Sequence, residues 1–124
     1  MPLDNPVGGV VFSAPGTTVW DGSSASPSAY ADLDLSAVVG DAEALVLLEV
    51  YRTGLDCGQL LVRRNGETMG ALAENAFCNR DISDVNYLMH VMLMTDSAGI
   101  IEWFTVVAQT GVIIKVRAFI RGAL

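Results

Sequence analysis

The chain has 124 residues, of which 52% are hydrophobic and only 17% are charged, and its formal net charge is −7. This length fits one domain with a single core, and the acidic balance argues against binding to nucleic-acid phosphates, which requires clustered basic residues. Soluble domains usually carry about 25% charged residues, so the deficit indicates that protein covers part of the surface. His90 or charged residues interrupt the apolar runs before the ~20 residues that a membrane span requires, and we expect no membrane partner.

The first nine residues contain two prolines and two glycines but little core material, which predicts an extended N-terminal arm at 1–9 ahead of one domain at 10–124. The arm lacks the basic and apolar regions of a signal peptide, so we expect the protein to be assembled in the cytoplasm. Residues 10–12 and 17–20 are predicted to form two short strands on either side of a turn at Pro15 and Gly16.

Alternating polar and apolar residues predict the next two strands. In residues 30–35, Leu33 and Leu35 face inward while Asp32 and Asp34 face outward. Residues 43–52 form a longer strand, with a helix as the alternative that propensity allows; the apolar spacing of two favours the strand. Its predicted core face consists of alternate residues: Ala44, Val46, Leu48 and Val50.

A strand at 59–64 is predicted to end in a tight turn at Asn65 and Gly66. Residues 68–84 are irregular, and we expect a long loop there with at most a short strand or helical turn, a type of segment that often carries recognition. Residues 85–107 are then predicted to form a long β-hairpin, whose turn is the polar segment 95–99. Its first arm is apolar on both faces, so it requires cover on both sides.

The last predicted strand, 112–121, presents alternate residues to the core: Val112, Ile114, Val116, Ala118 and Ile120. The opposite face then carries three basic side chains, those of Lys115, Arg117 and Arg121. Seven or eight short strands with turn signals between them predict an all-β fold, a single antiparallel β-sandwich that is jelly-roll-like.

The side chains that could carry catalysis are few. His90 is the only histidine and lies within an apolar arm, which favours a core or interface position over a catalytic base. Asp32 and Asp34 could hold Ca²⁺ together with loop oxygens, although a solvated outer face is the favoured explanation. Cys57 and Cys78 are expected to be reduced thiols, with a disulfide as the alternative. We therefore predict no enzyme activity, no catalytic residue, no cofactor and no metal site.

Two groups of side chains could contact a partner. The basic side chains of the last strand could meet an acidic face of a neighbouring copy, or they could be ordinary exposed residues. The aromatic side chains could form a sugar-stacking platform or belong to the core; they are Trp20, Tyr30, Trp103 and Phe104.

Several segments occur in a recognisable order: YADLDLSAVVG at 30–40, ALVLLEV at 44–50, RNG at 64–66, TDSAGIIEW at 95–103, and a final aliphatic strand. In this order they resemble the small β-sandwich modules of tailed-bacteriophage virion proteins, which occur in capsid decoration (cement) proteins, head fibres and tail-fibre tips. The resemblance covers about 30–121. The segment 68–84, with Cys78 and the run Asn79-Arg80-Asp81, departs from it and leaves any partner specificity carried there in doubt.

The resemblance implies a structural protein on the capsid surface of the virion, a decoration protein that binds the major capsid protein. It also implies a homotrimer, because capsid proteins pack around local threefold points. The alternative is a carbohydrate- or receptor-binding module of a phage fibre. The residues predicted to contact a partner come from the arm and the last strand: Pro2, Leu3, Pro6, Val7, Lys115, Arg117 and Arg121.

Overall fold

The computed structural model describes residues 10–67, 78–81 and 88–121, with the backbone alone for residues 10–15 and 78–81. Strands dominate this part of the chain. In order, the elements are β1 (Val10–Trp20), β2 (Ala31–Asp34), α1 (Ser36–Val39), β3 (Ala44–Arg52), β4 (Gln59–Arg64), β5 (Cys78–Asp81), β6 (Leu88–Met94), β7 (Ile100–Thr105) and β8 (Val112–Arg121).

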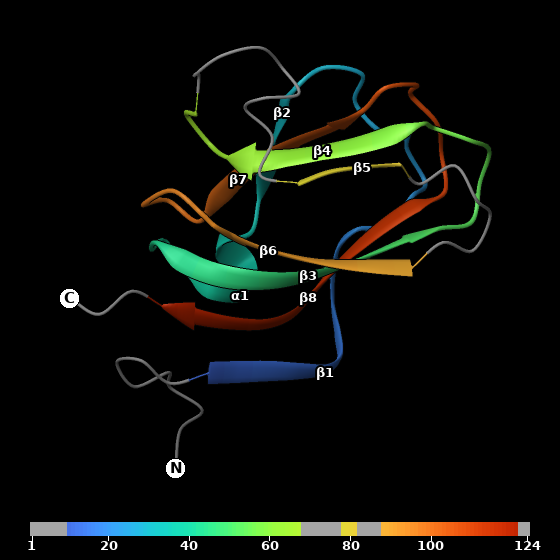
Figure 1. Cartoon of the computed structure of the whole chain (residues 1–124). Coiled ribbons are helices and arrows are strands. Elements are labelled where there is room, and N and C mark those ends of the chain that lie inside the picture. The colour runs from blue at the N-terminus through green and yellow to red at the C-terminus, as the bar shows by residue number, and fades with distance from the viewer. Residues whose placement is uncertain (1–9, 68–77, 82–87, 122–124) are drawn as a thin grey trace.

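The strands form two four-stranded antiparallel sheets, one in the order β1-β8-β3-β6 and the other in the order β2-β7-β4-β5. The sheets lie one above the other in Figure 1, with the short helix α1 at one end. The prediction of an all-β fold built as a β-sandwich is therefore confirmed. The predicted arm at 1–9 lies outside the described residues.

Individual strand predictions were confirmed to different degrees. The strands predicted at 59–64 and 112–121 have those bounds in β4 and β8, and Asn65 and Gly66 turn the chain after β4. The two short strands predicted at 10–12 and 17–20 form one strand, β1, whose pairing with β8 is interrupted between Phe12 and Thr17. A local irregularity therefore replaces the predicted turn. Of the predicted loop 68–84, only β5 is described.

The predicted hairpin at 85–107 is wrong. Strand β6 pairs with β3 in one sheet, whereas β7 pairs with β2 and β4 in the other (Figure 1). The segment between them is a tight turn, but it carries the chain across the sandwich: Asp96 N donates to Ile100 O, and Thr95 N still donates to Ala44 of β3. An apolar pattern indicates which way the side chains of a strand point but not which strand pairs with it. The prediction was wrong because it assumed that these two strands pair with each other.

The core lies between the sheets and is aliphatic. Its buried members include all four residues predicted on β3 (Ala44, Val46, Leu48 and Val50) together with Leu33, Leu35, Leu60, Val62, Leu93, Ile101, Trp103, Ile114 and Val116. Trp103 is completely buried and meets Trp20 edge to face, with ring centroids 5.1 Å apart. Because Trp103 belongs to the core, it is not available for stacking on a sugar.

A β-bulge in β8 reverses the predicted orientation of the end of that strand. Leu47 of β3 lies opposite Ala118 but Leu48 lies opposite Val116, so Arg117 is the extra residue. One inserted residue exchanges the two faces of a strand beyond it. Phe119 consequently joins the core at 6% exposure, whereas Ala118 and Ile120, which were predicted to face the core, lie on the outer side. Ala118 is nevertheless buried there, at 5% exposure.

Candidate functional site

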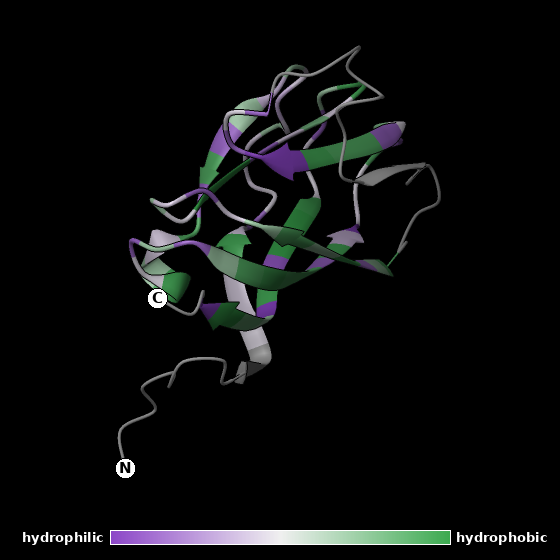
Figure 2. Cartoon of the chain, turned by 60° about the vertical axis from the view of Figure 1, so that its left-hand side comes forward, coloured by the Kyte–Doolittle hydropathy of each residue, from purple (hydrophilic) through white to green (hydrophobic). Residues whose placement is uncertain are grey.

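The outer face of the β1-β8-β3-β6 sheet is apolar across three strands. The pairing register of β3, β6 and β8, together with the alternation of side chains along each strand, places mainly apolar side chains on this outer face. We call the following residues the apolar face: Leu45, Leu47, Tyr51, Leu88, Met92, Met94, Ile113, Ala118 and Ile120. Leu88 and Met92 are half exposed, at 52% and 51%, and Figure 2 shows hydrophobic colouring along much of β3 and β6.

A small ionic cluster lies at the centre of the apolar face. The Glu49 carboxylate is 2.6 Å from Arg117 Nη1 and 3.7 Å from His90 Nε2, and Lys115 lies opposite Glu49 in the register of β3 and β8. Glu49 and Arg117 largely neutralise each other because they are in direct contact. Glu49 therefore has its cationic partner within its own chain.

The three basic residues of the last strand do not share one face. Lys115 and Arg117 belong to the outer side, but beyond the bulge Arg121 turns the other way, and its Nε donates to Val39 O of α1 at 2.8 Å. The predicted stripe of three is thus wrong for Arg121. The other predicted partner-binding residues lie outside the described part of the chain: Pro2, Leu3, Pro6 and Val7.

The outer face of the β2-β7-β4-β5 sheet carries the charged residues Asp32, Asp34, Arg63 and Glu102, and we call it the acidic face. Its centre is an ion pair in which Arg63 Nε lies 2.8 Å from Glu102 Oε1. The Arg63 guanidinium stacks on Tyr30, 3.7 Å from the ring centroid, and Tyr30 meets Phe104 edge to face. Burial raises the pKa of the Tyr30 hydroxyl, with the Arg63 charge opposing that shift.

Asp32 and Asp34 are exposed on β2 beside this ion pair, as predicted from their alternation. The side chain and backbone of Ser36 hydrogen-bond the Asp34 carboxylate and lower its pKa. Among the described residues, no three acidic, histidine or cysteine side chains are grouped as metal ligands. The carboxylates thus contribute negative charge to the acidic face.

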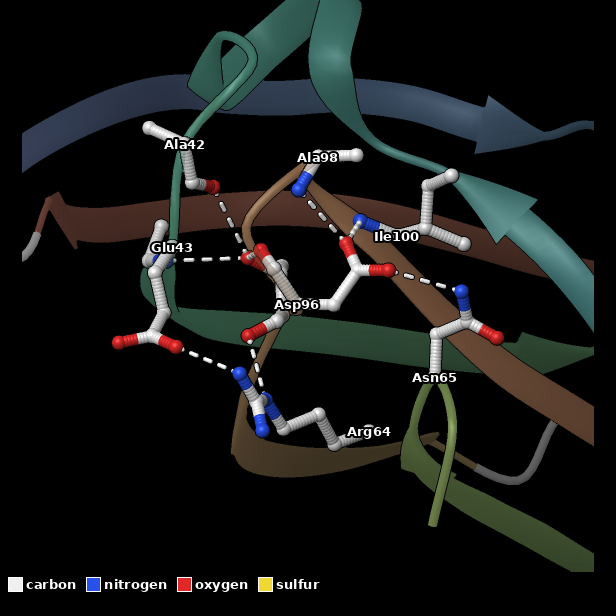
Figure 3. A network of polar contacts seen from close by, with 9 residues as sticks. Ala42, Glu43, Arg64, Asn65, Asp96, Ala98 and Ile100 are labelled. Atoms are coloured by element: carbon white, nitrogen blue, oxygen red, sulfur yellow. Dashed lines mark hydrogen bonds and ion pairs between the residues drawn. The ribbon is translucent and has the colours of Figure 1, made fainter.

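A hydrogen-bonded network closes the α1 end of the sandwich (Figure 3). Arg64 donates to Thr95 O at 3.0 Å and to the Glu43 carboxylate at 2.5 Å, and Asn65 Nδ2 donates to Asp96 Oδ2 at 2.8 Å. The other Asp96 oxygen accepts from Ala98 N and Ile100 N, both at 2.9 Å. The network thus joins the turn after β4, the crossing between β6 and β7, and the start of β3.

Burial acts to raise the pKa of Asp96, but hydrogen bonds from Ile100, Asn65 and Ala98 and the charge of Arg64 outweigh it, so the pKa is lowered. Close packing continues at Gly99, where a side-chain carbon would lie 2.6 Å from Gly40 O. Segments on which the phage resemblance rests, those around Gly40, Asn65 and Asp96, therefore meet in the structure. Their contacts there are internal to the fold.

A cleft of about 560 Å³ opens beside the end of β1. Its described lining combines an aromatic ring with small polar side chains: Thr18, Val19, Trp20, Asp21 and Ser24. The backbone and hydroxyl of Ser23 both hydrogen-bond Asp21 Oδ1 and lower the pKa of Asp21. Trp20 Nε1 is buried, and no described residue accepts a hydrogen bond from it.

Two buried polar features were missed by sequence reasoning. Arg52 is 1% exposed and donates to Gly54 O at 2.6 Å. The sequence contains a signal for this burial, because the alternation of β3 continues past Val50 and directs residue 52 inward. Ser26 and Thr105 share a short hydrogen bond between their hydroxyls that ties the 21–28 loop to β7, and no spacing in the sequence indicates it. Cys57 is fully buried, and the state of the two thiols stays a prediction.

No protein family, curated protein or solved structure matches this chain. The described helix is too short to cross a membrane.

Proposed function

We propose that this protein is a structural component of a tailed-bacteriophage virion, a capsid decoration protein that binds the major capsid protein and stabilises the capsid lattice. The observation that carries the proposal is the apolar face. Large contiguous apolar surfaces usually mark sites where another protein binds, and the broad outside of a sheet suits a protein surface better than a small ligand, which requires a concave pocket.

The proposal includes the finer architecture: a jelly roll preceded by an extended arm at residues 1–9. The strand order supports the jelly roll, because β1 pairs with β8, β2 with β7, β3 with β6 and β4 with β5. A double sheet of eight strands connected in this way occurs in viral capsid proteins and in lectins. The sequence resemblance favours a virion protein over a lectin, and it also implies a homotrimer on the capsid surface.

Binding to isolated capsids that lack the protein tests this function. Co-sedimentation should show saturable binding by the wild type and at least about tenfold weaker binding by Met92→Lys, because the lysine charge must be desolvated on the apolar face. Val106→Lys is the matched control, since Val106 has nearly the same exposure as Met92, 52% against 51%, but lies outside the apolar face. Failure of the wild type to bind capsids, or equal binding by both variants, would contradict the proposal.

The contribution of the arm is tested separately. Deletion of residues 1–9 should weaken capsid binding while the melting temperature stays the same, because the arm is proposed to lie on the capsid. Unchanged capsid occupancy by the shortened protein would remove the arm from the proposal while leaving the role of the apolar face intact.

The cleft beside Trp20 favours a second candidate, a carbohydrate-binding module. A tryptophan ring next to hydroxyl and carboxylate groups can stack on a sugar and hydrogen-bond its hydroxyls. Glycan-array binding that is lost in Trp20→Ala and weakened in Ser24→Ala, with the fold preserved, would support this candidate. The absence of glycan binding at millimolar concentrations would exclude it.

A further inference from the structure

A sandwich of two open sheets has four edge strands, here β1 and β6 in one sheet and β2 and β5 in the other. Three of them carry features that discourage pairing with another chain. Strand β1 contains Pro15, and its register with β8 breaks twice. Strands β2 and β5 have four residues each and contain charged residues, Asp32 and Asp34 in β2 and Arg80 and Asp81 in β5.

Strand β6 lacks all of these features. Its seven residues, LMHVMLM, include no proline, glycine, lysine, arginine or acidic residue. They pair with β3 without a break, from Leu88 opposite Tyr51 to Met94 opposite Leu45. A regular, uncharged and apolar edge of this length is a template for another strand.

The main-chain groups on the open side of β6 can be assigned. Thr95 N donates to Ala44 O, and in an antiparallel ladder alternate residues bond to the same neighbour. The N–H and C=O groups of Leu88, His90, Met92 and Met94 therefore point away from β3. In the part of the chain that the structure describes, no strand pairs with β6 on that side.

Charge favours a second copy of the chain as the occupant. Two chains with a net charge of −7 repel each other unless they meet where the local charge is low. Strand β6 carries no formal charge apart from any on His90, and the nearest carboxylate on the outer face, Glu49, is neutralised by Arg117 at 2.6 Å. The edge of β6 is thus a surface on which identical acidic chains can approach with little local charge repulsion.

We propose that β6 pairs antiparallel with β6 of a second copy about a twofold axis through Val91. This register places Val91 opposite Val91, His90 opposite Met92 and Leu88 opposite Met94, and it uses every outward main-chain group of the strand. It joins two sheets into one of eight strands and makes the apolar faces of the two copies continuous. The contact follows from the fold alone and does not rest on the proposed function. It is the alternative to the homotrimer that the sequence resemblance implies, and the mass of the purified chain decides between the two assemblies.

The twofold register is tested by a single cysteine. Val91 points inward against the core, and as a non-hydrogen-bonded pair at the axis two Val91→Cys residues would lie within disulfide distance. Met89→Cys is the matched control on the same face of the same strand, because residue 89 lies opposite residue 93 of the other copy. Under mild oxidation we expect a cross-linked dimer of Val91→Cys, with Met89→Cys at the level of the wild type, which reports the background from Cys57 and Cys78.

Proline substitution tests the hydrogen bonds of the edge. Met92→Pro removes a donor on the open side while leaving the ladder with β3 intact, a position at which an edge strand tolerates proline. Ser97→Pro is the control, placed after Asp96 in the turn that Gly99 N closes onto Asp96 O. By light scattering we expect twice 13.2 kDa for the wild type and Ser97→Pro, and at least about tenfold weaker association for Met92→Pro.

These measurements use the purified chain without capsids, so their outcome is separate from that of the capsid experiment. A monomeric wild type, a trimer, or a folded Met92→Pro that remains dimeric would overturn the proposal. Equal cross-linking of Met89→Cys and Val91→Cys would overturn it as well. If Met92→Pro does not fold, the cysteine pair decides alone.

Discussion

The outer faces of the two sheets have the same plan but different surroundings. Each has a central glutamate paired with an arginine on the neighbouring strand, Glu49 with Arg117 and Glu102 with Arg63. On the acidic face the arginine is 12% exposed and covered by Tyr30, whereas on the apolar face it is 38% exposed among apolar side chains. The acidic face is thus completed by the chain's own residues, while the apolar face leaves apolar surface that another protein can cover.

The largest loss of stability is expected for a substitution on the inner side of β3, and a substitution on its outer side should have a much smaller effect. Leu48→Ala should lower the free energy of unfolding by about 2–5 kcal/mol, because it leaves a cavity in the core. Leu47→Ala, the next residue on the outer side, should cost much less. Urea denaturation measures both; a loss below about 0.5 kcal/mol for Leu48→Ala would mean that the inward orientation of Leu48 is wrong.

Disruption of the network in Figure 3 should cause the next largest loss in the free energy of unfolding. Asp96→Ala removes three hydrogen-bond acceptor contacts and leaves Ala98 N and Ile100 N without their partner. We expect a loss of about 2–3 kcal/mol in the free energy of unfolding. Asp32→Ala is the control, an exposed carboxylate on the acidic face that should cause little change. Equal effects of the two substitutions would show that the network does not stabilise the fold.

The two ion pairs offer the direct test of the comparison. Glu102→Gln should cost about 1–2 kcal/mol, because Arg63 is left largely buried under Tyr30 without its counter-charge. Glu49→Gln should cost less than about 1 kcal/mol, since Arg117 can reach water. Thermal denaturation of both variants at the same pH measures the difference, and the reverse order would contradict the distinction between a covered and an uncovered face.

The smallest effect is a dependence on pH. Because the folded pKa of Asp96 is lowered, the stabilisation by its carboxylate is complete above the unfolded value of about 3.9 and is lost as the pH falls through the folded pKa. The stability difference between the wild type and Asp96→Asn should therefore shrink as the pH is lowered below about 4. A difference that stays constant down to pH 2 would exclude the carboxylate charge as its origin.

Much of this fold was predictable because alternation reports directly on burial. The bounds of β4 and β8 and the inward residues of β3 followed from it. The same rule failed at Arg117, where the β-bulge exchanges the two faces of β8. It also failed for β6 and β7, because alternation does not determine which strand pairs with which. The alternation also predicts that Arg52 faces inward, but this was missed because the predicted inward residues of β3 ended at Val50, the last apolar one.

The candidate site was less predictable than the fold. Lys115 and Arg117 were placed on an outer face in advance, but the apolar face depends on β6 lying beside β3, which only the tertiary structure establishes. The cleft at Trp20 arises where the end of β1 meets the loop that follows it. Its aromatic component was noticed in the sequence, but partly buried Trp20 could not be told from fully buried Trp103.

The nested order of the strand pairs has a consequence for how the chain folds. Strands β4 and β5 are neighbours in the sequence, whereas the pairs β3–β6, β2–β7 and β1–β8 enclose progressively longer segments. Because closing a longer loop costs more chain entropy before its contacts form, the pairs should assemble from the innermost outward. Folding should then take milliseconds to seconds, as is typical of folds dominated by contacts distant in sequence, with the joining of β1 to β8 as its final step.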